Sequence, residues 1–483
     1  MSDIRPLYLN GRFVDPGGKP IEVVNPSTGG ICGRVATVDR AGVRRAIDDA
    51  WKAFDGWRGR TAMERGQFLR KIADALEARV DEIARTITTE NGKPLPQSRG
   101  ELGMTIDHLR WFAEEGRRAY GRVVPNQAPG KRHLVIRTPV GPVGAIAPWN
   151  FPLVLAIRKA APALAAGCPV LLKPASATPL CAVAFAEAVH EAGLPEGVFQ
   201  LVAGSAREIA AEMTENPRCR KITFTGSTEV GRELMAAGAP FIKKLSLELG
   251  GQAPLLVFED ADLDAAVAGT LIAKFRNTGQ SCVAANRVYV QEGIHDAFVE
   301  RLVEKAAALP VGDGFTEGVE IGPLIDKAGL DAALAHIEQA VAGGATVRCG
   351  GKRWTGPNGE GANGFFLEPT VLTGVPAGAR CLTEETFAPV APVVPFATEA
   401  EAISLANDTE FGLAAYVFTR DVGRVWRLGE RLEAGSIGIN DAVPATSNCP
   451  FGGAKQSGLG RELGSEGLDA FLETKHLSFA GID

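Results

Sequence analysis

The sequence predicts an α/β protein with a doubly wound parallel sheet, and three observations lead to this prediction. From residue 143 onward, short β-rich runs alternate with alanine-rich, helix-like segments, which is typical of βαβ units. The length of 483 residues corresponds to about three domains. Apolar residues make up 45% and charged residues 22%, the balance of an ordinary soluble globular protein. We expect two α/β units and a small β appendage.

The first hundred residues are expected to be helical. Six apolar residues recur at steps of three and four and define one helix face: Leu69, Ile72, Leu76, Val80, Ile83 and Ile87. Asn91-Gly92 is expected to end this helix. A second helix face begins at Leu102 and continues through Leu109.

Residues 122–143 predict a two-stranded ribbon, because short apolar runs flank the turn Pro129-Gly130. The boundary between the two α/β units is expected near Gly250-Gly251. The predicted strands are 143–147, 169–173, 198–202, 221–225, 254–258, 287–290, 391–396, 413–418 and 435–439. Predicted helices between them include 179–192, 206–213 and 228–237.

Charge, hydropathy and cysteine spacing exclude several classes of protein. Lys+Arg 51 against Asp+Glu 57 gives a net charge of −6 without a basic block, so no nucleic-acid partner is expected. The most apolar stretch, 143–172, is broken by Arg158, Lys159 and prolines, so no membrane span is expected. The eight cysteines never come closer than 13 residues, which fits neither a zinc knuckle nor a disulfide framework. With no apolar signal core at the start, a cytoplasmic protein is expected.

A glycine turn is the first candidate binding motif. Gly226 and Gly231 have the spacing of a phosphate-binding loop, but Arg232 stands where that loop needs lysine. The turn follows a strand-like run and precedes a helix-like segment, which places free N–H groups where a pyrophosphate would sit. A plain strand-to-helix turn is the alternative.

Three residues are candidates for catalysis. Cys282 follows glycine and small polar residues, as an accessible nucleophile would, although a buried cysteine is usually only a small apolar residue. Glu248 lies in an apolar run, and burial would raise its pKa into the range of a general base; a salt-bridged structural glutamate is the alternative. Asn150 is expected to point its amide at a developing oxyanion, or else to cap a turn.

Taken together, these segments resemble the aldehyde dehydrogenase family over essentially the whole chain. The motifs occur in the family's order and spacing at Pro148 to Pro152, Lys173-Pro174, Phe224 to Thr228, Leu247 to Gly251, Gly279 to Cys282, Glu384 to Phe387 and Pro450 to Gly453. The resemblance implies a Rossmann-type coenzyme domain (1–120 and 141–250, with 448–468 returning to it), an α/β catalytic domain (251–447) and an oligomerisation ribbon (121–140 and 469–483).

The resemblance also implies a mechanism. Cys282 attacks the aldehyde carbon to form a thiohemiacetal, and Asn150 with the Cys282 backbone N–H stabilises the oxyanion. Hydride passes to NAD or NADP, Glu248 activates water to hydrolyse the thioester, and no metal is required. Residues assigned to the coenzyme are Trp149, Lys173, Ser176, Gly226, Ser227, Gly231, Glu385 and Phe387.

The choice of coenzyme depends on position 176. Family members strict for NAD often carry a glutamate there, which repels a 2′-phosphate. Ser176 removes that charge and Lys173 would attract the phosphate, so NADP use or dual use is our hypothesis, with NAD use as the alternative.

Within the family, the chain looks most like the succinate-semialdehyde dehydrogenases. Arg158 and Arg276 match two arginines that grip the substrate carboxylate in that group. Ala445 stands where the group has a substrate-contacting serine, so one hydrogen bond, worth about 1.5–3 kcal/mol, is missing. This change favours two alternative substrates, glutarate semialdehyde and an uncharged aldehyde.

Other functions remain open alongside this reading. A coenzyme-A-acylating enzyme lacks the base that Glu248 provides, and a non-catalytic structural protein on this fold usually lacks the nucleophile. The ribbon and the stretch from Phe471 to Phe479 match the family's oligomerisation elements, and exposed strand edges need covering. A homodimer or homotetramer is therefore expected.

Overall fold

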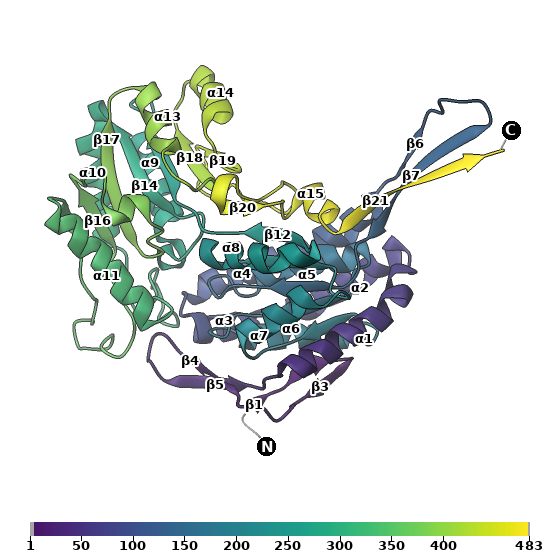
Figure 1. Ribbon diagram of the computed structural model, residues 1–483. Coiled ribbons are helices and arrows are strands. Elements are labelled where there is room, and N and C mark those ends of the chain that lie inside the picture. The colour runs from purple at the N-terminus through teal and green to yellow at the C-terminus, as the bar shows by residue number, and fades with distance from the viewer. Residues whose placement is uncertain (1–3, 482–483) are drawn as a thin grey trace.

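Two large sheets with flanking helices and a projecting three-stranded ribbon make up the protein (Figure 1). The structure is a computed structural model and describes residues 4–481, so the outermost residues of the predicted domains lie outside it. The predicted α/β class is confirmed. Within 4–481, none of the helices combines the length and apolar character needed to cross a bilayer.

The first sheet has eight strands in the order β20-β12-β11-β8-β9-β10-β2-β3. The strands from β12 to β10 in this order are parallel. Because the chain runs outward from β8 in both directions, a topological switch point lies between β8 and β11. The bounds are β2 (Leu7–Leu9), β3 (Arg12–Val14), β8 (Val143–Ile146), β9 (Val170–Lys173), β10 (Phe199–Leu201), β11 (Lys221–Thr225), β12 (Lys244–Glu248) and β20 (Gly458–Leu459).

Helices cover both faces of this sheet, as expected for a doubly wound fold. One face carries α1 (Arg40–Arg58), α7 (Ala206–Glu215) and α8 (Thr228–Gly238). The other face carries α5 (Val154–Ala166) and α6 (Leu180–Glu191), with α2 (Ala62–Glu77), α3 (Val80–Asn91) and α4 (Leu95–Glu115) outside them. Helix α15 (Gly464–Asp469) packs against α5.

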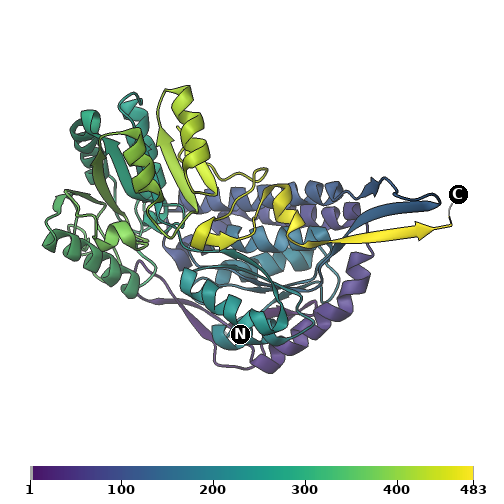
Figure 2. The same cartoon turned by 45° about the horizontal axis from the view of Figure 1, so that its top comes forward.

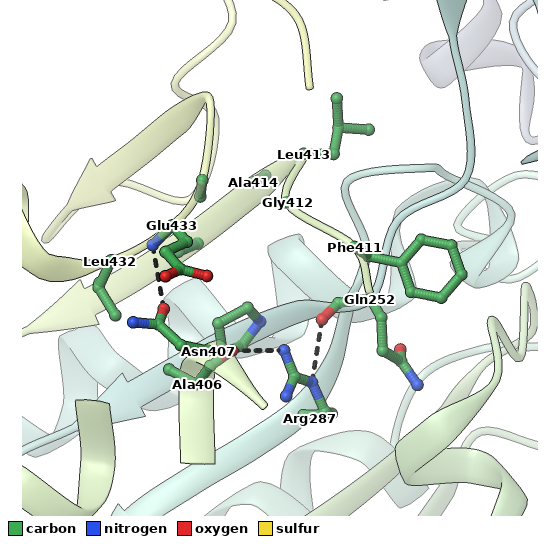
Figure 3. A pocket seen from close by; sticks show the side chains of 13 residues that line it. Gln252, Arg287, Ala406, Asn407, Phe411, Gly412, Leu413, Ala414, Leu432 and Glu433 are labelled. Atoms are coloured by element: carbon green, nitrogen blue, oxygen red, sulfur yellow. Dashed lines mark hydrogen bonds between the residues drawn. The ribbon is translucent and has the colours of Figure 1, made fainter. Parts of the chain in front are cut away.

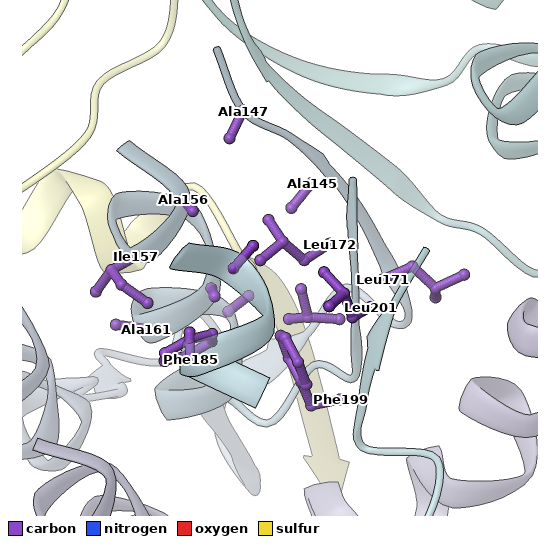
Figure 4. Packing of buried hydrophobic residues seen from close by; sticks show 14 of the residues in the cluster. Ala145, Ala147, Ala156, Ile157, Ala161, Leu171, Leu172, Phe185, Phe199 and Leu201 are labelled. Carbon is purple, nitrogen blue, oxygen red and sulfur yellow. The ribbon is translucent and has the colours of Figure 1, made fainter. Parts of the chain in front are cut away.

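Helix α5 is buried on every side because it lies between the sheet and α4. Its small alanines let the neighbouring backbones approach, and Figure 4 shows its side chains packed with those of β9, β10 and α6. The rings of Phe185 and Phe199 meet edge to face, with centroids 5.2 Å apart. This core fixes the carboxyl ends of the strands that carry the candidate site.

The second sheet has seven strands in the order β15-β16-β17-β14-β13-β18-β19, and only β15 is antiparallel. Its strands are β13 (Ala253–Val257), β14 (Ala285–Gln291), β15 (Thr346–Cys349), β16 (Thr370–Thr373), β17 (Val390–Phe396), β18 (Ala414–Phe418) and β19 (Ser436–Ile439). Its helices are α9 (Leu263–Phe275), α10 (Glu292–Ala307), α11 (Lys327–Ala342), α12 (Arg380–Thr383), α13 (Glu399–Asn407) and α14 (Val422–Arg431).

Two smaller sheets complete the fold. One consists of β1 (Ile4–Arg5), β5 (Ile31–Val35) and β4 (Ile21–Val24). The other is the ribbon of β6 (Arg122–Val124), β7 (Lys131–Pro139) and β21 (Leu472–Ala480), which Figure 2 shows extending away from the body. The predicted ribbon is confirmed, and the C-terminal stretch adds its third strand.

The structure corrects several expectations about the elements. Residues 4–35 form strands β1–β5, not helix, because strands of two to five residues leave too short a pattern to detect. The single helix face is divided between α2 and α3, although Gly92, with a φ of 87°, ends α3 as predicted. Strands β12, β15 and β16 were not anticipated. The sheets change near Gly250-Gly251, but the domain division itself stays a prediction.

Candidate active site

A cavity of about 590 Å³ opens at the switch point between β8 and β11. Both large sheets contribute to its lining, which consists of Pro148, Trp149, Asn150, Thr225, Gly226, Ser227, Leu249, Gly250, Cys282, Glu385 and Phe387. A second cavity, of about 460 Å³, includes Arg158, Arg276, Ala445 and Cys282 in its lining. Cys282 is the only residue that lines both, so the predicted nucleophile lies where the cavities meet.

A strained loop presents Cys282. The preceding 3₁₀ turn η3 (Arg276–Gly279) holds Asn277 and Thr278 at φ values of 52° and 58°. Such left-handed conformations cost about 1–3 kcal/mol for each residue and persist only where the surroundings enforce them. Gly251 packs so closely that a Cβ atom there would collide with the Cys282 carbonyl oxygen. The loop is therefore locked against the glycine pair that follows Glu248.

The Cys282 thiol is protonated at neutral pH. Burial raises its pKa to about 12, the charges of Glu385 and Glu248 add to this effect, and Arg158 opposes it. Because the thiolate is the nucleophilic form of cysteine, attack on a carbonyl requires a base to remove this proton.

Glu248, at the end of β12, meets the physical requirement for such a base. Its side chain is buried, and neither carboxylate oxygen has a hydrogen-bond partner among the described residues. Burial raises the pKa of Glu248 well above its ordinary value, and the negative charge of Glu462 raises it further. The expected direction of this shift is confirmed.

A buried ion pair near Glu248 escaped the sequence analysis. Lys159 donates hydrogen bonds to both Glu462 and Thr225, and its positive charge opposes the rise in the Glu248 pKa. The sequence carried one signal of a buried charge. Arg158 and Lys159 are the two charged residues in a segment whose remaining residues are all apolar. Its partner is distant in the chain, so only the fold identifies the pair.

Asn150 lies just beyond β8 and is buried. Its side-chain nitrogen Nδ2 donates to the Gln280 carbonyl at 3.1 Å, which ties the amide to the loop before Cys282. Its own carbonyl accepts hydrogen bonds from Lys93 and Asn277. An amide in this position has a second N–H proton to offer a reacting oxygen.

The second cavity contains two cationic side chains. Arg158 is buried, Arg276 is half-buried, and neither forms an ion pair within residues 4–481. Arg158 lies over the Phe451 ring at 4.9 Å, and Arg276 lies 5.6 Å from the Phe151 ring. Sequence reasoning missed these aromatic walls and Met104, which also lines the cavity.

Comparison with known proteins identifies the fold family. The model of the family described as "Aldehyde dehydrogenase family" matches residues 13–477. The chain belongs to the aldehyde dehydrogenase family. It is therefore an NAD(P)-dependent oxidoreductase that converts an aldehyde to a carboxylic acid.

Close relatives of this aldehyde dehydrogenase include enzymes named for semialdehydes. A glutarate-semialdehyde dehydrogenase of Pseudomonas aeruginosa is 51% identical over 98% of this chain and 97% of its own. A succinate-semialdehyde dehydrogenase of Escherichia coli, named for NADP(+), is 49% identical over 97% of this chain and 96% of its own. The crystal structure of a succinate-semialdehyde dehydrogenase from Burkholderia pseudomallei matches with a TM-score of 0.96 and 47% identity, covering 99% of this chain and 98% of that one.

The 590 Å³ cavity fits the dinucleotide coenzyme of an aldehyde dehydrogenase. Ser227 caps the N-terminus of α8 by accepting from Val230 N, so this helix end faces the cavity with its positive dipole. Glu385 accepts a hydrogen bond from Gly251 N at 3.0 Å through one carboxylate oxygen, and its role in binding ribose stays a prediction. The Trp149 and Phe387 rings meet edge to face with centroids 5.4 Å apart and form an apolar wall.

Three residues predicted to bind the coenzyme lie outside the lining of this cavity. Gly231 is inside α8 and packs against Leu249. Lys173 ends β9 beside β8, and burial lowers its pKa to about 8. Ser176 is exposed in the following loop. Their roles stay predictions.

Figure 3 shows the buried Arg287 beside Gln252 and Ala406, at the edge of a small cavity. Arg287 donates to the backbone carbonyls of Gln252, Leu405 and Ala406. Gln252 in turn donates to the Glu384 carbonyl at 2.7 Å, next to Glu385. The small cavity beside Arg287, of about 240 Å³, therefore belongs to the framework that joins β13 to the loop carrying Glu385.

Proposed function

We propose that this aldehyde dehydrogenase oxidises short semialdehydes that carry a distal carboxylate, with succinate semialdehyde as its main substrate. The supporting observation is the pair Arg158 and Arg276, which lines the cavity ending at Cys282 without a carboxylate partner among the described residues. A buried guanidinium without a counterion favours binding of an anion, and its planar fork suits a carboxylate. The substrate itself supplies the missing charge.

In the proposed reaction, Glu248 accepts the Cys282 proton and the thiolate attacks the aldehyde carbon. The Asn150 amide and the Cys282 backbone N–H donate to the resulting oxyanion of the thiohemiacetal. As the oxyanion re-forms the C=O bond, the C–H bond breaks and the thioester results; NAD or NADP, when bound, would supply the acceptor for the departing hydride. Glu248 then loses its first proton to solvent and removes a proton from water, whose oxygen attacks the Cys282 thioester. The carboxylic acid leaves, and the departing Cys282 sulfur takes up the proton held by Glu248 to restore the thiol.

Glutarate semialdehyde is the second candidate substrate. Ala445 lines the cavity with a methyl group and leaves more length and fewer hydrogen bonds than a serine would. Relatives named for glutarate semialdehyde, in Pseudomonas aeruginosa and Pseudomonas putida, are 51% and 49% identical to this chain.

Replacement of Arg276 by methionine is expected to separate charged from uncharged substrates. Loss of a charged hydrogen bond costs about 1.5–3 kcal/mol, so kcat/KM for succinate and glutarate semialdehyde should fall by about 10- to 100-fold. A medium-chain and an aromatic aldehyde serve as controls and should change by less than about twofold. Steady-state kinetics on all four aldehydes measure this. Succinate semialdehyde ranking last with the unmodified enzyme would contradict the proposed substrate.

We also propose that the enzyme uses NADP, either in preference to NAD or alongside it, because position 176 carries an uncharged serine and Lys173 lies nearby in sequence. Replacement of Ser176 by glutamate is expected to weaken NADP binding by about tenfold or more through repulsion of the 2′-phosphate. NAD binding should stay within about twofold. Fluorescence titration of both coenzymes measures the dissociation constants, and Ser176→Gln is the uncharged control. A strong NAD preference in the unmodified enzyme would overturn the proposal.

The assembly we propose is a homodimer or homotetramer formed in part through the ribbon. Strands β6 and β21 are both edge strands, and Val123 and Tyr120 expose 79% and 75% of their surface.

We further propose a cytoplasmic location, in accord with free thiols at all eight cysteines.

A further inference from the structure

We propose that the buried ion pair of Lys93 and Glu101 positions the Asn150 amide, and thereby the oxyanion site. The proposal rests on the proposed function, in which Asn150 stabilises the oxyanion. Neither Lys93 nor Glu101 was singled out by sequence reasoning. Lys93 follows the turn that ends α3, and Glu101 lies on the buried face of α4.

Stability alone does not explain this pair. Both side chains have zero exposure, and Lys93 Nζ lies 2.6 Å from Glu101 Oε2. Removing two charges from water is costly, and apolar residues of similar volume often serve a core as well or better. The pair is therefore expected to serve a further purpose, which its remaining contacts identify.

Those contacts reach both ends of one short segment. Lys93 Nζ donates to the Asn150 carbonyl at 2.7 Å. Glu101 Oε1 accepts from the backbone nitrogens of Leu153 and Val154 at 2.9 and 3.2 Å. Backbone N–H groups at the start of a helix have no carbonyl partner within the helix. The N-cap residue of α5, Leu153, has no side-chain acceptor, so Glu101 takes the place of a capping side chain. The pair thus fixes residues 150–154 from both sides.

The same segment is joined to the nucleophile loop. Asn277 Nδ2 donates to the Asn150 carbonyl at 2.8 Å and to the Gln280 carbonyl at 3.0 Å. Gln97, from the first turn of α4, accepts a hydrogen bond from Asn277 N at 2.9 Å. The Asn150 carbonyl is therefore the point where Lys93 and the strained loop before Cys282 meet. Displacing Lys93 would release one side of this junction.

The orientation of the Asn150 side chain follows from this arrangement. Its Nδ2 already gives one N–H to the Gln280 carbonyl, so the direction of the other N–H depends on where the backbone of Asn150 is held. An error of about 1 Å in such a group lowers a rate by about 100-fold. Lys93 and Glu101 act in this way as positioning residues.

A double-mutant cycle with Asn150 tests the proposal. Lys93→Met is expected to lower kcat by about 10- to 100-fold, while the NADP dissociation constant from fluorescence titration stays within about twofold. In an Asn150→Ala background, Lys93→Met should lower kcat by no more than about a further twofold. Alanine keeps the backbone carbonyl that Lys93 contacts but lacks the side-chain amide that this contact positions. Additive losses in the double variant would overturn the positioning role. An Asn150→Ala enzyme with full activity would instead overturn the assigned role of Asn150.

Two further variants separate positioning from folding. Lys93→Met combined with Glu101→Leu removes both charges and leaves no uncompensated ion, so it should fold but remain about as slow as Lys93→Met. A kcat for this double variant equal to that of the unmodified enzyme would contradict the proposal. Glu90 provides a matched control for Glu101, since it is fully buried and accepts from Leu180 N and Cys181 N at the start of α6. Glu90→Gln should leave kcat within about twofold, whereas Glu101→Gln should lower it by about tenfold or more.

Discussion

Replacement of Cys282 by alanine is expected to lower kcat for aldehyde oxidation by about 10⁴-fold or more, because in the proposed reaction the Cys282 thiolate forms the covalent intermediate. Cys282 alone lines both the coenzyme-sized cavity and the arginine-containing cavity. Steady-state assays and a rapid-mixing measurement of NADPH formation should both show the loss. A burst of NADPH that persists in Cys282→Ala would contradict the assignment of the nucleophile.

The raised pKa of Cys282 adds a measurement that does not depend on turnover. Burial raises this pKa to about 12, so the free enzyme holds almost no thiolate at neutral pH. Alkylation of Cys282 by iodoacetamide should therefore be slow at pH 7 and accelerate about tenfold for each pH unit up to pH 9. Peptide mass spectrometry follows Cys282 selectively, and a Cys449→Ser background removes a thiol that is exposed. A rate that is already constant above pH 7 would show that the thiol is activated without its base.

The sequence predicted the parts of the fold that repeat a strong local pattern. Strand β11 has the predicted bounds 221–225, and Gly92 ends α3 because its left-handed backbone favours glycine. Strand β12 was missed because it begins at Lys244, directly after Lys243, and short charged runs resemble loops. In the fold, β12 pairs with β11 on one edge and β20 on the other, an arrangement that local sequence does not record.

Motifs predicted the candidate catalytic residues, but not the residues that influence them. Glu248, Asn150 and Cys282 each lie within a recognisable segment. The fold places Asn150 and Cys282 in the lining of one cavity, and it places Glu248, at the end of β12, near enough for its charge to raise the Cys282 pKa. The charges that shift their properties come from distant elements: Glu462 acts on Glu248, and Lys93 contacts Asn150. Buried lysines and glutamates look like surface residues in a sequence, since only their partners reveal that they are enclosed.

Replacement of Glu248 by glutamine is expected to lower kcat by about 10²- to 10⁴-fold, the range for loss of a general base. Acylation needs the base only to remove the thiol proton, which free hydroxide also removes at high pH, whereas hydrolysis of the thioester needs the base to activate a neutral water molecule. At pH 9 we therefore expect a burst of about one NADPH per active site followed by slow turnover. The absence of a burst at any pH would assign the hydrolytic step to another group.

Glu248 also predicts opposite pH dependences for activity and stability. Its raised pKa favours the protonated form, so the carboxylate that acts as base increases with pH and activity is lost as pH falls through this pKa. The free energy of unfolding changes in the opposite direction and falls as the pH rises. Above the ordinary pKa of glutamate, Glu248 ionises freely in the unfolded chain, whereas the buried carboxyl of the folded protein does not. The thermal midpoint of Glu248→Gln relative to the unmodified enzyme should therefore rise as the pH increases above the ordinary pKa of glutamate. A difference in midpoint that stays constant with pH would mean that Glu248 titrates normally, and its role as a base tuned by burial would then be wrong.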